Sequence, residues 1–109
     1  MNDHITLRQN LTMLTDFYEM TMANGYFVNG YQDRIAYFDM FFRHVPNNGG
    51  FAIMAGVQQL TEYLEQMHFS DADIAYLNST GLFFEEFLEY LRTFEFCCDV
   101  WAVPEGTPI

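Results

Sequence analysis

The sequence contains no lysine, and its four arginines stand against 15 aspartates and glutamates, for a formal net charge of −11. A chain this acidic repels nucleic-acid phosphates and anionic membranes, so we expect neither as a partner. Proteins bind polyphosphate groups mainly with arginine, lysine and metal ions, and few such cations are present here. The composition therefore argues against both nucleic-acid binding and a polyphosphate site within this segment.

Cysteine and long apolar runs are also scarce. The two cysteines, Cys97 and Cys98, are neighbours, and adjacent side chains of an extended chain point to opposite faces. We therefore interpret them as half-buried strand residues rather than as a disulfide, a nucleophile or metal ligands. The sequence shows no basic leader segment and no apolar run of about 18 residues, so we expect a cytoplasmic protein without a membrane segment.

Aromatic side chains, in contrast, are abundant. The 109 residues include 12 Phe and 7 Tyr, and half of all residues are apolar. This is too much apolar surface for a disordered chain, and the length suits one domain with its own core. A small domain has difficulty covering so many aromatic side chains, so we expect part of the surface to face another domain or subunit.

Helical spacing of apolar residues recurs along the chain. The first helix is predicted from about Asp16 to Phe27, with Thr15 or Asp16 as N-cap and Glu19 at capping-box spacing. Three more are predicted over residues 57–67, between Ser70 and Gly81, and over residues 83–94. Their buried sides are expected to hold Val57, Leu60, Leu64 and Met67; Ile74 and Leu77; and Phe84, Phe87, Leu88 and Leu91.

Residues 34–46 instead alternate with a period of two, which predicts a strand with one wholly apolar face and one mixed face. The turn PNNGG and an apolar run over residues 51–56 suggest a hairpin, and residues 97–103 resemble a further strand. The predicted fold class is α+β, one domain over residues 1–109 with helices packed on a short mixed or antiparallel sheet. Because the sequence stops in a strand–turn region, we interpret it as a fragment.

Few residues offer catalytic chemistry. The histidines His4, His44 and His68 lack a second ligand at helical spacing, and the glutamates of residues 85–89 form a solvated helix face, so no metal site or catalytic residue is expected. Asp16 and Tyr18 leave two interpretations open. They can serve as N-cap and packing residue, or Tyr18 can stack on a planar heteroaromatic ligand while Asp16 orients the ring or an arginine.

Five blocks in order carry a resemblance to a known family. They read MLTDFYEMTMANGYF, YFDMFFRHVPNNGGFAIMAG, FSDADIAYL, FFEEFLEYLRTF and VWAVPEGTPI, and they cover nearly the whole chain. Together they resemble the N-terminal region of nicotinate phosphoribosyltransferase. The sequences FFR at residues 41–43 and PEGT at residues 104–107 belong to these blocks, and we interpret them as structural.

The resemblance implies an enzyme that joins nicotinate to phosphoribosyl pyrophosphate, forming nicotinate mononucleotide and pyrophosphate with coupled ATP hydrolysis, in NAD salvage. It implies that an irregular β/α barrel follows this segment. That barrel carries the residues that bind the substrate phosphates and Mg²⁺, and a transiently phosphorylated histidine beyond Ile109. It also implies a homodimer in which Tyr18 stacks on nicotinate in the partner's barrel, with Asp16 beside that pocket. The isolated fragment is expected to be inactive.

Two alternatives remain open at this level. One is a relative in the same superfamily that uses nicotinamide or quinolinate, because residues reading the substrate carboxylate are not expected in this segment. The other is a stand-alone acidic module whose aromatic face binds a protein partner. Continuation of the reading frame past Ile109 into a barrel-sized sequence distinguishes this second alternative from the enzyme.

Overall fold

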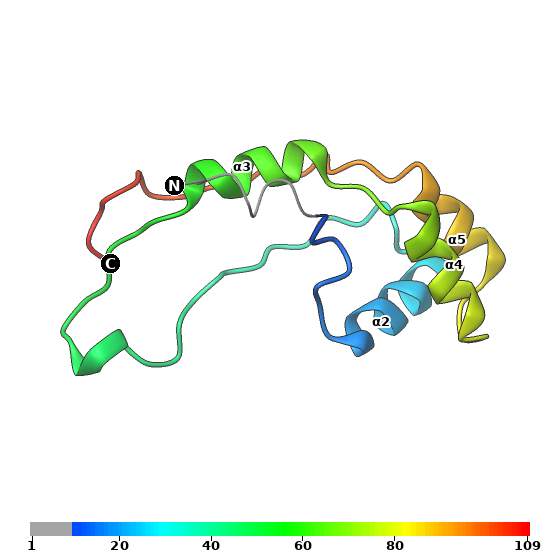
Figure 1. Cartoon of the computed structure of the whole chain (residues 1–109), viewed down its shortest axis with the longest axis horizontal. Helices are drawn as coiled ribbons and strands as arrows, with labels where there is room; N and C mark the ends of the chain where they lie inside the picture. Colours follow the sequence, from blue (N-terminus) through cyan, green and yellow to red (C-terminus); the bar gives the residue numbers. More distant parts are fainter. Residues whose placement is uncertain (1–9) are drawn as a thin grey trace.

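The computed structural model describes residues 10–109, in which four α-helices are joined by long extended segments (Figure 1). The helices are α2 (Phe17–Val28), α3 (Val57–Gln66), α4 (Asp71–Ser79) and α5 (Glu85–Arg92), and a short 3-10 turn, η1, lies at Pro46–Asn48. Among the described residues, no helix has both the length and the apolar character needed to cross a membrane.

The core lies at one end of the molecule, where α2, α4 and α5 meet. Its buried apolar side chains are Met20, Ile74, Leu77, Phe87, Leu88 and Leu91, and Met13, Ala23, Phe27, Phe69 and Phe83 pack around them. Helix α3 contributes no buried residue and lies outside this cluster, along the upper side of the molecule in Figure 1. The hydrophobic core is therefore a three-helix cluster rather than a sheet covered by helices.

Local sequence signals explain α4 and α5. The Ser70 hydroxyl accepts a hydrogen bond from the Asp73 amide at 3.1 Å, and the Asp73 carboxylate accepts one from the Ser70 amide at 2.9 Å. This capping box confirms the predicted start of α4, and Gly81 follows its end with a φ of +71°. In α5 the inward positions are confirmed except for Phe84, which lies at the N-cap and is exposed.

The α+β prediction is wrong. Within residues 10–109 there is no strand and no sheet, and only an isolated antiparallel bridge joins Ile53 to Pro108. Residues 35–44, which lie within the strand predicted over residues 34–46, are extended but have no hydrogen bond from their main chain to any described residue. Both of their faces are exposed, including the face of Phe38 and Met40 that was expected to be buried.

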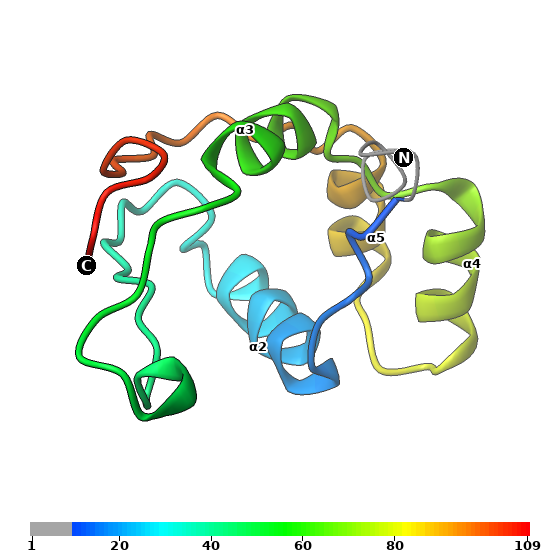
Figure 2. The same cartoon turned by 60° about the vertical axis from the view of Figure 1, so that its left-hand side comes forward.

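The physical reason for this error is that alternation specifies an extended backbone but not a partner for it. The predicted hairpin does not close after η1, where Asn47 and Asn48 have φ values near +55°. The chain then leads away from residues 35–44, so that the two segments form the sides of an open arch (Figure 1), with the short turn of η1 at its tip (Figure 2). A ladder requires a second chain segment at hydrogen-bonding distance, which sequence periodicity cannot supply.

Residues 52–58 instead pair with the end of the chain. Ala52 and Ile109 exchange two main-chain hydrogen bonds of 2.9 and 2.8 Å, and the Met54 amide donates to the Thr107 carbonyl at 2.9 Å. The Glu105 carboxylate accepts hydrogen bonds of 3.1 Å from the amides of Gly56 and Gln58, at the start of α3. A carboxylate at a helix N-terminus interacts favourably with the positive end of the helix dipole. The Glu105 side chain of the PEGT sequence therefore acts as a remote cap for α3.

The expectation for the cysteines is also wrong, since Cys97 and Cys98 are both exposed and free and lie in a segment without strand structure. Trp101 in the same segment is 93% exposed. His4 falls outside the described residues.

Candidate functional site

Asp16 and Tyr18, the two residues predicted to contact a ligand, lie at the start of helix α2. Side chains on the inner face of α2 anchor the helix to the core. The ring of Phe17 meets that of Phe83 edge-on at 5.8 Å, and Met20 is buried. One turn on, the Asn24 side-chain oxygen accepts a hydrogen bond of 3.0 Å from the Phe84 amide. Near the helix end, Phe27 packs on aromatic rings of α5. These contacts fix which side of α2 faces outward.

The start of α2 confirms Asp16 as the N-cap residue, but its side chain makes no capping hydrogen bond. Glu19 does not complete a capping box either. Its carboxylate accepts a hydrogen bond of 2.6 Å from the Thr15 hydroxyl, which lies one turn earlier. Asp16 is exposed, so its carboxylate stands beside the positive end of the helix dipole without a protein partner among residues 10–109.

Tyr18 lies two residues further on and points outward. Its side chain is 59% exposed, and its hydroxyl makes no hydrogen bond to any described residue. Packing in the core therefore does not account for this tyrosine, and capping does not account for the Asp16 carboxylate. The two side chains share one end of the helix and offer a flat aromatic face next to a negative charge.

Met22 and Tyr26 continue the exposed side of α2, and sequence reasoning did not single them out. They follow Tyr18 at intervals of four residues, so the three side chains form a stripe along the outer face of the helix. Their spacing of four residues is a signal of one helix face, but Phe17, Met20 and Phe27 have helical spacing as well and indicate a second apolar face. Only the position of α5 shows which of the two faces is buried.

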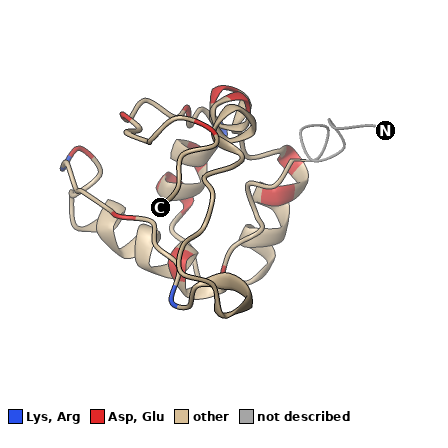
Figure 3. Ribbon diagram, turned by 90° about the vertical axis from the view of Figure 1, so that its left-hand side faces the viewer, with Lys and Arg blue, Asp and Glu red and all other residues tan. Residues whose placement is uncertain are grey.

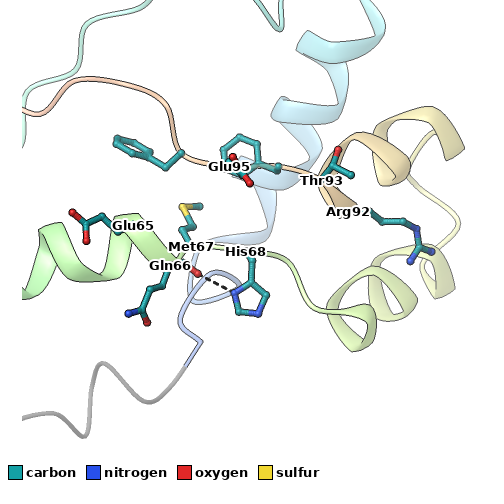
Figure 4. Close-up of a pocket in the computed structure, with 9 residues that line it drawn as sticks. Glu65, Gln66, Met67, His68, Arg92, Thr93 and Glu95 are labelled. Atoms are coloured by element: carbon teal, nitrogen blue, oxygen red, sulfur yellow. Dashed lines mark hydrogen bonds between the residues drawn. The ribbon is translucent and has the colours of Figure 1, made fainter.

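Among residues 10–109, two of the hollows lie elsewhere and include neither Asp16 nor Tyr18. The first, of about 450 Å³, lies between the end of α3 and the end of α5 (Figure 4). Its lining consists of Glu65, Gln66, Met67, His68, Arg92, Thr93, Phe94, Glu95 and Phe96. His68 Nδ1 lies 3.0 Å from the Gln66 carbonyl oxygen, and because a carbonyl only accepts, Nδ1 is the donor.

Arg92 turns away from the centre of this first hollow, as Figure 4 shows. Its guanidinium is 3.0 Å from Glu89 and 3.4 Å from Asp71, and these exposed ion pairs occupy it. The hollow therefore has carboxylates and an imidazole but no free cation from Arg92. No group of three His, Cys, Asp or Glu side chains in the described part of the chain is placed to hold a metal ion.

The second hollow, of about 580 Å³, runs beside α3 and is lined by Val57, Thr61, Leu64, Glu65, Phe96, Cys98, Asp99, Val100, Trp101 and Ala102. Most of its lining side chains are apolar, and Glu65 and Asp99 are the acidic ones. Figure 3 shows that acidic positions are spread over the whole fold while basic ones are few. Neither hollow has the cations that a phosphate ligand requires.

Comparison with known proteins shows the family to which the chain belongs. Residues 13–109 match the family described as nicotinate phosphoribosyltransferase (NAPRTase) N-terminal domain. The chain is 39% identical over 106 residues to "Nicotinate phosphoribosyltransferase pncB2" of Mycobacterium tuberculosis, a match covering 96% of this chain and 23% of that protein.

Relatives from other organisms give the same result. The match to the nicotinate phosphoribosyltransferase of Bacillus subtilis has 37% identity over 97 residues and covers 89% of this chain and 20% of that protein. The match to the human enzyme of that name has 37% identity over 99 residues and covers 87% of this chain and 18% of that protein.

The chain thus spans about a fifth of the length of the curated relatives it matches. The resemblance drawn from the sequence blocks is confirmed over this region, in bacterial and animal relatives alike. The chain belongs to the family of nicotinate phosphoribosyltransferase N-terminal domains.

Proposed function

We propose that residues 1–109 are the N-terminal domain of an enzyme that forms nicotinate mononucleotide and pyrophosphate from nicotinate and phosphoribosyl pyrophosphate in NAD salvage. The observation that carries this proposal is the match of residues 13–109 to the family, together with relatives that are four to five times longer and bear the enzyme's name. The domain supplies part of the nicotinate site, and the remaining polypeptide supplies the rest.

The chemistry divides naturally between these two parts. The pyridine nitrogen attacks the anomeric carbon of the ribose as pyrophosphate leaves, so ring and sugar must be aligned and the charge of the phosphates balanced. An aromatic face can align the ring. Balancing the phosphates requires cations. Arg92 is paired and Arg34 lies over the Tyr31 ring, which leaves Arg43 as the remaining arginine of residues 10–109, too few for ATP or pyrophosphate. No group of three His, Cys, Asp or Glu side chains among the same residues is placed to hold Mg²⁺. We assign those groups to the polypeptide beyond Ile109.

Tyr18 is the residue that we assign to nicotinate, stacked on the pyridine ring in the other subunit of a homodimer. Its exposure supports this role, since the contacts among residues 10–109 make no other use of its ring or its hydroxyl. Nicotinate is an anion, and Asp16 and Glu19 flank Tyr18 with negative charge. The carboxylate of the substrate must therefore face away from them, and Asp16 is suited to hold an arginine of the partner beside the ring.

The first test is whether the longer chain, meaning the reading frame carried through its natural stop codon, has this activity. With labelled nicotinate, phosphoribosyl pyrophosphate and ATP it should form nicotinate mononucleotide. We expect kcat/KM for nicotinamide and quinolinate to be at least about a hundredfold lower, because a site built for one carboxylate leaves polar groups unpaired with other substrates. A preference for either other substrate, or a frame that ends at Ile109, would contradict the proposal.

The second test concerns Tyr18 in the longer chain. Tyr18→Ala should raise the KM for nicotinate by about two- to twelve-fold, the equivalent of about 0.5–1.5 kcal/mol of aromatic stacking, with little change for phosphoribosyl pyrophosphate. Tyr18→Phe keeps the ring and should be mild.

Tyr26→Ala is the matched control for this test. It removes an exposed tyrosine from the same face of α2, about 12 Å further along the helix axis, and should leave the KM for nicotinate unchanged. Stacking by Tyr18 would be excluded if Tyr18→Ala and Tyr18→Phe changed the KM for nicotinate equally. It would also be excluded if Tyr18→Ala and Tyr26→Ala changed that KM equally.

A further inference from the structure

Thr12 is the one buried polar residue among residues 10–109, with 6% of its surface exposed. Its hydroxyl donates a hydrogen bond of 2.6 Å to the side-chain oxygen of Asn10 and accepts one of 3.3 Å from the Tyr63 hydroxyl on α3. The same Asn10 oxygen accepts a hydrogen bond of 3.2 Å from the Thr12 amide. A buried polar group with its hydrogen bonds made specifies one arrangement of the groups around it. Thr12 therefore fixes how the segment before α2 lies against α3.

Asn10 extends these contacts to the loop between α3 and α4. Its side-chain amide donates a hydrogen bond of 3.1 Å to the His68 carbonyl oxygen. We call the side chains of Asn10, Thr12 and Tyr63 the latch. Its two contacts with α3 and the loop after it join residues that are 51 and 58 positions apart in the sequence. In Figure 1 the segment before α2, coloured blue, runs from beside the end of α3 to the start of α2.

The latch needs a fixed support on α3, and apolar packing does not provide it, because α3 has no buried residue. The Glu105 carboxylate does so at the start of this helix, where it accepts hydrogen bonds of 3.1 Å from the amides of Gly56 and Gln58. Tyr63 lies in the last turn of the same helix and is half-buried. Helix α3 is therefore held by hydrogen bonds at both ends, and Tyr63 is presented to Thr12 in a defined position.

The start of α2 lacks the side-chain cap that usually stabilises a first helical turn. Asp16 at the N-cap makes no capping hydrogen bond, and the first amides of a helix have no partner within it. A helix end of this kind frays unless the chain before it is held. Here main-chain hydrogen bonds of 2.9 and 3.0 Å form two tight turns over residues 11–15. These turns connect Thr12 directly to the first turn of α2.

From these contacts we infer that the latch positions Tyr18 by fixing the first turn of α2, which makes Thr12 and Tyr63 positioning residues of the nicotinate site. This inference rests on the proposed function. Contacts of α2 with the core set which side of the helix faces outward. The latch sets where its first turn lies, and a stacked ring acts on its ligand only from the correct position.

Hydrogen exchange in the longer chain tests this placement whether or not that chain is active. Thr12→Val keeps the shape of the side chain and removes its hydroxyl. It should speed exchange of the Leu14, Thr15 and Glu19 amides by at least about tenfold, and change the amides of α4 and α5 by no more than about threefold. Thr12→Ser keeps the hydroxyl and should preserve slow exchange at the start of α2. Unchanged exchange in Thr12→Val would overturn the inference.

Kinetics of the longer chain test the positioning role. Thr12→Val should raise the KM for nicotinate by about three- to tenfold, with little change in kcat or in the KM for phosphoribosyl pyrophosphate, because it displaces the aromatic ring alone. Thr12→Ser should restore the wild-type KM. Tyr63→Phe should raise the KM for nicotinate by a smaller factor than Thr12→Val, because Thr12 keeps its hydrogen bond to Asn10.

Tyr76→Phe is the matched control for Tyr63→Phe. Tyr76 is exposed on α4, and its hydroxyl makes no hydrogen bond to any described residue, so the KM for nicotinate should not change. Equal effects of Tyr63→Phe and Tyr76→Phe would contradict the role of the Tyr63 hydroxyl in the latch.

A double-mutant cycle separates positioning from a general loss of stability. If the latch acts through Tyr18, Thr12→Val should change the KM for nicotinate by no more than about 1.5-fold in a chain that already carries Tyr18→Ala. Independent effects that multiply would overturn the inference. A Tyr18→Ala chain with an unchanged KM would contradict the proposed role of Tyr18 itself, and the exchange rates would then decide whether the latch holds the start of α2.

Discussion

Replacing Leu77 by alanine is expected to lower the free energy of unfolding of the 109-residue chain by about 2–5 kcal/mol. Leu77 is a fully buried residue of α4, in a core with only a few other buried side chains. Deleting its side chain loses apolar burial and leaves a cavity. Because small domains have total stabilities of about 5–15 kcal/mol, this single change should remove much of the helical structure at 37 °C.

Urea unfolding followed by circular dichroism at the helix band is the suitable measurement. Tryptophan fluorescence is not, because Trp101 is almost fully exposed and far from the buried cluster in sequence. Leu82→Ala is the matched control, since Leu82 is exposed in the loop between α4 and α5, and it should change stability by about 0.5 kcal/mol or less. Similar losses for both leucines would mean that α2, α4 and α5 do not form the stabilising core.

Mixing two inactive variants of the longer chain should restore activity if Tyr18 serves the partner's site. One variant is Tyr18→Asp, which removes the ring and adds a carboxylate facing an anionic substrate, at an expected loss of about a hundredfold or more. The other is inactivated beyond residue 109. When half of the dimers are mixed and each has one intact site, activity should reach at most about a quarter of wild type.

In the reciprocal control, one chain carries both Tyr18→Asp and the inactivating change beyond residue 109, and this doubly changed chain is mixed with wild type. If sites are shared between subunits, mixed dimers are inactive, and activity falls to about a quarter rather than to about half. Mass spectrometry confirms that subunits have exchanged. Without recovery in the first mixture, and with about half the activity in the second, Tyr18 would have to act within its own chain.

Features encoded by neighbouring residues were predictable from the sequence. The capping box of Ser70 and Asp73, the stop at Gly81 and the buried positions Ile74 and Leu77 all depend on contacts within a few residues. Such contacts form in the same way whatever the rest of the chain does. The helix start at Asp16 was also placed correctly, although its side chain makes no capping hydrogen bond there. The family blocks identified the relatives. The sequence alone therefore determined the helices and the family.

Tertiary structure decided everything that depends on a distant partner. Alternation in residues 35–44 specifies an extended backbone, yet no segment of residues 10–109 lies where it can complete a ladder, so the predicted sheet does not exist. Glu105 caps α3 from 49 residues away in sequence, and no local pattern announces this. The outward direction of Tyr18 likewise depends on α5 covering the opposite side of α2. Pairing and burial are set by distances between remote segments, which only the folded chain defines.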